Sequence, residues 1–350
     1  MTARVLIVDD SATMRALLAQ LLGRERDIEV VGTAADARDA RVMMRELNPD
    51  VVTLDIEMPG MNGLDFLEKI MSLRPTPVVI VSGITQRGCE TTIRALELGA
   101  VDCYAKPDGS IGALLEHDGG RLAAMVRSAA SVRFVRLPGA PAVSPPVARE
   151  TIEISSSAAG SAQLIAIGAS TGGVEALHQV LPAFPVSCPP TVVVQHISGA
   201  FAPAMADRLD KQCIARVKLL ESGELLKPGH IYIAPGNDRH AVIAGGSTMM
   251  GRLVNGDPIS GHRPSIDAMF ESIATRLGPA AVGILLTGMG QDGARGLLAM
   301  RRAGAHTIAQ DEATCTVYGM PRAAADMGAA EKILPLPRIA ERALAAAKAA

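Results

Sequence analysis

Short apolar runs alternate with amphipathic stretches through the first third of the chain. Residues 5–8 are all apolar, and Ser11 then precedes apolar positions at helical spacing, namely Met14, Leu17, Leu18, Leu21 and Leu22. Strands are predicted at the mostly apolar stretches 28–32, 51–54, 78–81 and 101–104, with helical patterns such as 38–47 between them. Short runs followed by helical periodicity indicate strand–helix units. Their repetition over residues 1–125 predicts an α/β domain with a doubly wound, flavodoxin-like parallel sheet.

Polar residues stand where several of these strands are predicted to end. Asp9 and Asp10 follow the first, Asp55 follows the third, Ser82 ends the fourth and Lys106 follows the fifth. Carboxylates gathered at one sheet edge repel each other unless a hard cation such as Mg²⁺ is present. An acceptor aspartate, a cation, a hydroxyl and a lysine together suit phosphoryl transfer onto a carboxylate. The alternative is that the aspartates only cap helices, which is common for one residue but not for the whole set.

The same residues resemble the signature of response-regulator receiver domains over residues 1 to about 125. The resemblance includes the run Asp55-Ile56-Glu57-Met58-Pro59-Gly60-Met61-Asn62-Gly63 and the pair Lys106-Pro107. It implies that a histidine kinase phosphorylates Asp55, and that Asp9, Asp10, Asp55 and the backbone carbonyl of Glu57 hold Mg²⁺. It also implies that Ser82 and Lys106 bind the phosphoryl oxygens. The chain departs from the pattern at Cys103, where receivers often carry an aromatic switch residue; Tyr104 is next to it.

The second half opens with another strand, turn and helix pattern. Apolar residues 164–167 run into Gly168-Ala169-Ser170-Thr171-Gly172, and residues 174–181 have helical spacing. The turn fits G-x-S-x-G, in which a strained turn projects a nucleophilic serine. A glycine turn that serves only close packing is an alternative. A dinucleotide-binding loop is disfavoured because its G-x-G-x-x-G pattern needs glycine where Ser170 stands.

Two further residues occupy comparable strand ends. His196 ends the strand predicted from residue 191, and Asp292 lies in a glycine turn after residues 281–286. Because the carboxyl ends of parallel strands form one rim, Ser170, His196 and Asp292 are predicted to meet. Their chemistry predicts a serine nucleophile, a histidine base and an orienting carboxylate. A helix cap for Ser170 or Asp292 and a core role for His196 are the alternatives, and His240 and His262 compete as the base.

The order Ser, His, Asp differs from that of ordinary α/β-hydrolases. It resembles the catalytic domain of chemotaxis receptor methylesterases, the CheB family. Besides the three strand ends, the resemblance is carried by segments 234–236, 262–267, 286–294, 310–312 and 318–321. It implies hydrolysis of glutamyl γ-methyl esters, and deamidation of glutamines, on the cytoplasmic helices of methyl-accepting chemoreceptors. It also implies an oxyanion site made by the backbone N–H groups of Thr171 and Met289.

Composition and charge narrow the alternatives. The 350 residues carry a net charge of −2 and no basic block, which argues against a nucleic-acid-binding protein. No apolar run approaches the ~18 residues of a membrane span, and the chain starts directly into a strand. The cysteines are scattered, which predicts free thiols in a reducing compartment; we therefore expect a cytoplasmic monomer that does not insert into membranes. The second half has no metal-binding spacing, so no cofactor is expected there.

Prolines at 138, 141, 145 and 146 and the Ser/Ala/Gly-rich stretch 155–160 predict a linker. The expected organisation is a receiver at 1–125, a linker at 126–160 and a catalytic domain of a second doubly wound parallel sheet at 161–350. Phosphorylation is expected to relieve inhibition of the catalytic domain by the receiver. Two other functions stay open: an output domain that binds a nucleotide at Gly172-Gly173 without catalysis, and a DNA-binding regulator, which the lack of a basic recognition helix disfavours.

Overall fold

The computed structural model describes residues 2–58, 63–106, 118–132, 163–236, 238–245 and 248–349. The chain divides into two compact units, residues 1–134 and 135–350, which are described separately. The predicted linker stretches at 138–146 and 155–160, and the motif residues 59–62 and Pro107, lie outside the described residues. The domain limits 1–125, 126–160 and 161–350 therefore stay predictions.

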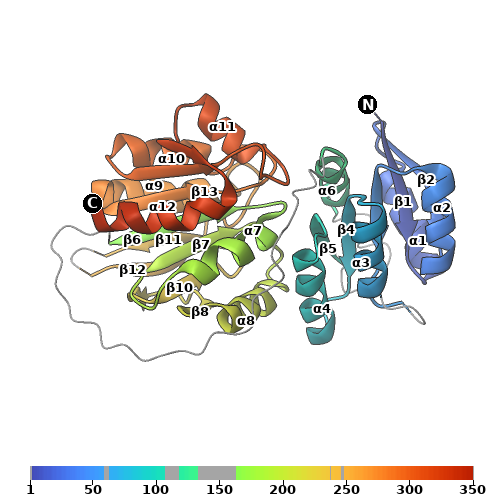
Figure 1. Ribbon diagram of the computed structural model, residues 1–350, viewed down its shortest axis with the longest axis horizontal. Helices are drawn as coiled ribbons and strands as arrows, with labels where there is room; N and C mark the ends of the chain where they lie inside the picture. Colours follow the sequence, from blue (N-terminus) through green and yellow to red (C-terminus); the bar gives the residue numbers. More distant parts are fainter. Residues whose placement is uncertain are drawn as a thin grey trace. The chain divides into compact units, whose positions relative to one another are not determined.

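The first unit is built from parallel strands that alternate with helices (Figure 1). Its strands are β1 (Ala3–Val8), β2 (Ile28–Ala34), β3 (Val51–Leu54), β4 (Val78–Ser82) and β5 (Asp102–Ala105). Its helices are α1 (Ala12–Leu22), α2 (Ala37–Leu47), α3 (Gly63–Leu73), α4 (Gln86–Glu97) and α6 (Arg121–Ala130). The sheet order β2-β1-β3-β4-β5 is the flavodoxin-like order, which confirms the predicted fold class.

Local sequence explains where α1 begins and which face it buries. Ser11 is the N-cap, and its Oγ accepts a hydrogen bond from the Met14 N–H at 3.3 Å. The buried leucines of α1 pack in one core with Val5 and Ile7 of β1 and Leu122 of α6. Full burial of each such side chain is worth about 2 kcal/mol, so this face holds α1 and α6 on the same side of the sheet.

The second unit contains a larger parallel sheet. Its strands are β6 (Leu164–Ala169), β7 (Thr191–Gln195), β8 (Arg216–Leu219), β10 (His230–Ile233), β13 (Ala281–Leu285), β14 (His306–Gln310) and β15 (Lys332–Leu334). The strand order is β15-β14-β13-β6-β7-β10-β8, and the paired strands are all parallel. This sheet confirms that the second half is also a parallel α/β fold.

Helices cover both faces of this sheet (Figure 1). One group packs together on one face: α7 (Gly173–Val180), α8 (Ala202–Gln212) and α12 (Leu336–Ala349). The other face carries α9 (Ile266–Leu277), α10 (Ala294–Arg302) and α11 (Met320–Asp326). Residues of these last three helices share a core with Leu164, Ala166 and Leu285 of the sheet.

A small antiparallel sheet, which the sequence pattern did not predict, adjoins α9. It has the order β11-β12-β9, formed by β9 (Glu224–Leu225), β11 (His240–Ala244) and β12 (Met250–Val254). β11 contacts α9, and the buried Ala241 and Ile243 join the same core as α9. This packing places the start of α9 beside the loops at the carboxyl edge of the large sheet.

The chain changes direction within the large sheet at β6. From β6 it proceeds to β7 on one side, and β13 later pairs with the other side of β6. Such a switch point opens a crevice at the carboxyl ends of the strands. The register pairs Ala169 with Gln195, so Ser170 and His196 are the next residues on neighbouring strands. None of the described helices is both long enough and apolar enough to cross a membrane.

Candidate functional site

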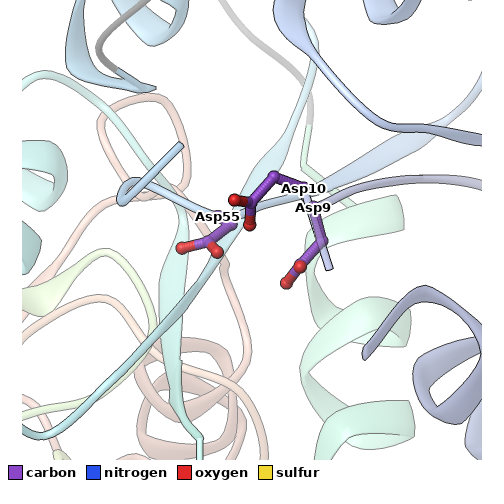
Figure 2. Close-up of side chains that lie close together, drawn as sticks. All are labelled: Asp9, Asp10 and Asp55. Atoms are coloured by element: carbon purple, nitrogen blue, oxygen red, sulfur yellow. The ribbon is translucent and has the colours of Figure 1, made fainter. Parts of the chain in front are cut away.

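Three aspartates gather at the carboxyl edge of the first sheet. Asp9 and Asp10 follow β1 and Asp55 follows β3, and their ligand atoms all lie within 4.8 Å of one another (Figure 2). Backbone amides fix two of the carboxylates: the Ser11 N–H donates to Asp9 Oδ1 at 2.9 Å, and the Glu57 N–H donates to Asp55 Oδ1 at 3.0 Å. Carboxylate oxygens in a cluster of this size, with Asp9 and Asp55 buried and Asp10 exposed, fit the hard, partly hydrated Mg²⁺ ion.

Lys106 joins two of these carboxylates. Its Nζ lies 2.6 Å from Asp55 Oδ2 and 2.9 Å from Asp9 Oδ2. Burial alone would lower the pKa of Lys106, but the bonds and charges of Asp55 and Asp9 outweigh burial and raise it. Burial, and then the neighbouring charge of Asp55, raise the pKa of Asp9 against the effect of Lys106. The lysine therefore stays positively charged beside Asp55.

The other residues predicted for this site lie at the same sheet edge. Ser82 ends β4, fully buried, and its Oγ donates to the Gly83 carbonyl at 3.4 Å. Glu57 is exposed two residues after Asp55. Cys103 is buried in β5, and the neighbouring Tyr104 is also buried, with its hydroxyl donating to Asp118 Oδ1 at 2.8 Å. Tyr104 is thus held in the core by burial and by its hydrogen bond to Asp118.

In the second unit, Ser170 follows β6 directly and precedes α7. Gly172 makes the turn with φ +75°, and a Cβ there would lie 2.4 Å from Thr316 atoms. The Ser170 N–H donates to the Thr287 carbonyl at 3.0 Å, and the Gln195 Nε2 donates to the Ser170 carbonyl at 2.8 Å. The backbone N–H and carbonyl of Ser170 are therefore both hydrogen-bonded, to residues on either side of β6, and this fixes the position of Ser170. The residue is 8% exposed.

His196 and Asp292 are bonded to each other at the same edge. His196 Nε2 lies 2.9 Å from Asp292 Oδ2. Asp292 also accepts bonds from the N–H groups of Ile266 at 2.7 Å and Asp267 at 3.1 Å and from Ser265 Oγ at 2.8 Å. Burial alone would raise the pKa of Asp292, but His196 and these donors outweigh burial and lower it. Asp292 is therefore a buried, ionised carboxylate at the N-terminus of α9, where the helix dipole favours negative charge.

The other ring nitrogen of His196, Nδ1, is not used in a hydrogen bond to any described residue. Because the Asp292 carboxylate accepts, the proton of a neutral His196 ring lies on Nε2. Nδ1 is buried and has no hydrogen-bond partner among the described residues. The His196 backbone N–H donates to the Ala169 carbonyl at 3.0 Å, which holds the histidine beside the strand that carries Ser170. The hydrogen bonds of the described residues do not include one between Ser170 Oγ and His196, so the serine's role stays a prediction.

The structure separates the two competing histidines. His240 is buried in β11, where its Nδ1 accepts from the Ser265 N–H at 3.1 Å and its Nε2 lies 3.0 Å from the Asp257 carbonyl. Both ring nitrogens of His240 are therefore used in holding the loop before α9. His262 instead stacks on His196, with ring centroids 3.8 Å apart and planes 7° apart.

The predicted oxyanion residues flank Ser170. Thr171 is buried and immediately follows it, whereas Met289 is 42% exposed in the turn after β13. A Cβ on Gly288, next to Met289, would lie 2.6 Å from the Ser170 Cβ. The turn that carries Met289 thus packs against the serine, and the oxyanion role of both N–H groups stays a prediction.

Sequence reasoning missed the residues that hold Asp292. Ser265 both caps α9, by accepting from the Ala268 N–H at 3.3 Å, and donates to Asp292. The sequence signal for the cap was present, because a serine precedes a helical pattern that carries an acidic residue in its first turn. The link from that cap to Asp292 is a tertiary contact that only the fold provides.

Comparison with known proteins gives consistent family matches. The CheB methylesterase model matches residues 165–343 and the response regulator receiver domain model matches residues 5–116. The chain is 52% identical to a protein-glutamate methylesterase/protein-glutamine glutaminase of Caulobacter vibrioides, over 99% of this chain and 98% of that protein. A protein of the same name from Rhizobium etli is 50% identical over 98% of this chain and 96% of that protein. The solved CheB methylesterase catalytic domain of Thermotoga maritima is 35% identical and covers 54% of this chain and 99% of its own, with a TM-score of 0.51.

Proposed function

The chain belongs to the CheB methylesterase family and carries a receiver domain, and from this we propose how its residues perform and regulate the reaction. It is a carboxylic ester hydrolase, a protein-glutamate methylesterase with protein-glutamine glutaminase activity. Its substrates are glutamyl γ-methyl esters and glutamines on the cytoplasmic helices of methyl-accepting chemoreceptors. A site at the rim of a sheet suits a side chain presented on a helical bundle.

Catalysis proceeds through an acyl-enzyme. Ser170 Oγ attacks the ester carbonyl carbon while His196 Nδ1 takes the hydroxyl proton, and Asp292 stabilises the imidazolium that forms. The N–H groups of Thr171 and Met289 stabilise the tetrahedral oxyanion, each such donor being worth about 3 kcal/mol. His196 then gives its proton to the leaving atom as its bond to the carbonyl carbon breaks: the ester oxygen departs as methanol, and the amide nitrogen of a glutamine departs as ammonia. His196 then takes a proton from water, which attacks the acyl carbon; as the bond from that carbon to Ser170 Oγ breaks, His196 returns the proton to Oγ, which releases the glutamate side chain and regenerates Ser170.

One observation carries this proposal: the 2.9 Å contact between His196 Nε2 and Asp292 Oδ2, which leaves Nδ1 buried and without a partner among the described residues. An uncompensated buried nitrogen costs about 1–3 kcal/mol. A lone pair held in that condition, one strand away from Ser170, is suited to accept the serine proton. This arrangement favours a hydrolase over an output domain that only binds a nucleotide.

The receiver supplies the regulation. A chemotaxis histidine kinase donates a phosphoryl group to Asp55, and Lys106 and Ser82 bind the phosphoryl oxygens. Asp9, Asp10, Asp55 and the Glu57 carbonyl would hold Mg²⁺, which would neutralise charge on the transferring group. The chain's own contribution is the Lys106 ammonium, which already contacts Asp55 at 2.6 Å. The protein acts as a monomer in the cytoplasm.

Replacement of the nucleophile tests the mechanism. Ser170→Ala is expected to lower methanol release from methylated receptor membranes by roughly 10⁴- to 10⁶-fold, because loss of a triad member removes the covalent route. Ser222→Ala is the matched control: this serine is exposed and only accepts from the Leu253 N–H at 3.1 Å. Methanol release that is unchanged in Ser170→Ala would exclude the serine mechanism.

A further inference from the structure

We infer that His262 is a positioning residue for the catalytic base: the flat ring of His262 fixes the plane of the His196 imidazole, so that Nδ1 is held toward Ser170. This inference rests on the proposed serine mechanism and adds a residue to it. Its basis is the stacked pair itself, in which the ring centroids of His196 and His262 lie 3.8 Å apart and the planes differ by 7°.

A hydrogen bond at one nitrogen does not by itself fix an imidazole. The bond from His196 Nε2 to Asp292 restrains one point of the ring, and the ring can still tilt about that point and move Nδ1. Two parallel rings at 3.8 Å are in full van der Waals contact. A tilt of His196 would push its edge into His262, so the stacked ring restricts the motion that the hydrogen bond leaves free.

The backbone that carries His262 is itself well fixed. Ile259 and His262 exchange two backbone hydrogen bonds, of 3.1 and 2.9 Å, around a two-residue turn. Ser260 and Gly261 take φ values of +52° and +80°, as a type I′ turn requires at both central positions. The next residue, Arg263, donates to the Gly256 carbonyl at 2.9 Å and lies 3.2 Å from Asp238 Oδ1. The ring of His262 therefore starts from a defined backbone position.

The same short segment holds both partners of His196. His262 contacts the face of the His196 ring, and three residues later Ser265 donates to the Asp292 carboxylate that binds Nε2. The ring and the carboxylate are thus set relative to each other by residues 262–265.

The contact needs a flat ring, and the inference does not require a titratable group at position 262. His262→Ala is therefore expected to lower kcat by roughly 10- to 100-fold, the cost of a misplaced catalytic group. KM is expected to stay within about twofold of the wild-type value, because the contact acts on the transition state and not on substrate binding. His262→Phe keeps the flat aromatic face and is expected to restore kcat to within about threefold of wild type.

The experiment measures methanol release from methylated receptor membranes by the full chain, at a series of membrane concentrations, for wild type, His262→Ala and His262→Phe. His306→Ala is the control, because His306 begins β14 at the opposite edge of the sheet, where its Nδ1 pairs with Glu331 at 2.8 Å. A thermal melt of each variant shows whether it is folded. If His262→Ala melts early, the comparison of His262→Phe with wild type still decides, since a kcat far below wild type in a stable Phe variant overturns the inference.

Other outcomes also overturn it. A wild-type kcat in His262→Ala would show that the ring is not needed. An increase in KM alone would show that His262 contacts the substrate instead of the base. Labelling of Ser170 by a fluorophosphonate is run in parallel on wild type and Ser170→Ala. Absence of labelling in wild type together with activity in Ser170→Ala would refute the serine mechanism itself, whereas normal labelling with an indifferent His262→Ala refutes only the role of His262.

Discussion

At the scale of single residues, Asp292 shows how a charge is kept in an almost fully buried place. Its side chain accepts bonds from His196, Ser265 and the first two amides of α9. Three of these donors do not depend on the histidine, so the carboxylate keeps its place when His196 changes protonation state. Charge-assisted hydrogen bonds of this kind are about twice as strong as neutral ones, which explains why burial does not neutralise the group.

Replacement of this carboxylate by an amide is expected to stop catalysis. Asp292→Asn has the same shape, but its amide cannot stabilise the His196 imidazolium, and its NH₂ group would oppose an α9 amide or favour the other His196 tautomer. We expect methanol release to fall about 10⁴-fold. Asp326→Asn is the control, because that carboxylate is exposed on α11 and lies 3.7 Å from Arg322. Activity within tenfold of wild type in Asp292→Asn would contradict the assigned role.

The same residue predicts an acid dependence of stability. The pKa of Asp292 in the folded chain lies below its ordinary value of 3.8, so the unfolded chain binds its proton more readily. Asp292 therefore makes its full contribution to the free energy of unfolding when the pH is above its ordinary pKa. That contribution is lost as the pH falls through the lower pKa that Asp292 has in the folded chain. The difference in urea midpoint between wild type and Asp292→Asn is expected to be largest near neutral pH and to shrink below about pH 4. A difference that grows on acidification would refute the ionised assignment.

A site residue could be predicted from the sequence where the pattern that marks it lies in its own segment of the chain. Ser170, His196 and Asp292 each follow an apolar run, and parallel strands bring such ends to one rim, so their common location could be predicted. The sequence also predicts His196 as the base, but it leaves His240 and His262 as competitors, because their separation depends on which ring nitrogens the fold uses. Both ring nitrogens of His240 are hydrogen-bonded, one to the Ser265 amide and the other to the Asp257 carbonyl. These are tertiary contacts, which no local sequence pattern reveals.

At the scale of elements, the turn between β6 and α7 depends on its glycines. Gly172 and Gly223 have similar positive φ values, +75° and +85°, but only Gly172 faces a neighbour, because a Cβ added there would lie 2.4 Å from Thr316 atoms. The two positions therefore separate backbone strain from steric overlap. The neighbouring Gly173 meets the Gln195 side chain in the same way, so the turn is closely packed on both sides.

Alanine substitutions at these two positions are expected to differ. Gly223→Ala adds only the strain of a left-handed conformation, about 1 kcal/mol. Gly172→Ala adds overlap with Thr316, about 1–3 kcal/mol more, and shifts Ser170, so its methanol release falls as well. Urea unfolding and the methanol assay check both effects. Equal losses of stability in the two variants, with full activity in both, would show that the turn tolerates a side chain.

The elements also show why parts of the fold could not be predicted. The strands predicted at 5–8, 51–54, 78–81, 164–167 and 281–286 are mostly apolar, as expected for strands buried on both faces, and the structure confirms them as β1, β3, β4, β6 and β13. The strands β8 and β15 mix charged and apolar residues, and the sequence pattern did not predict them. The antiparallel strands β11 and β12 have mixed burial, with Met250, Arg252 and Val254 only partly buried or exposed. Their pairing is set by contact with α9, and a pattern confined to single strands does not reveal such a contact.

At the scale of the whole molecule, two α/β units place different chemistry at equivalent sheet edges. Each unit collects its polar residues where parallel strands end: carboxylates and a lysine in the first, and a hydroxyl, an imidazole and a carboxylate in the second. Phosphorylation adds negative charge at the first edge. One way in which this change could regulate the esterase, proposed above, is relief of inhibition at the second edge.

Deletion of residues 1–140 tests that regulation. If the unphosphorylated receiver inhibits the esterase, the truncated chain is expected to release methanol faster than the unphosphorylated full chain, because a restraint on the catalytic edge has been removed. The full chain with Asp55→Asn is expected to stay at the low rate even with the kinase, ATP and Mg²⁺ present, whereas wild type is activated. Removal of Mg²⁺ with a chelator should hold wild type at the same low rate, since phosphoryl transfer to Asp55 needs the cation.

A truncated chain that is no faster than the unphosphorylated full chain would remove inhibition from the mechanism. Activation by phosphorylation would then have to act through a receptor-binding surface of the receiver.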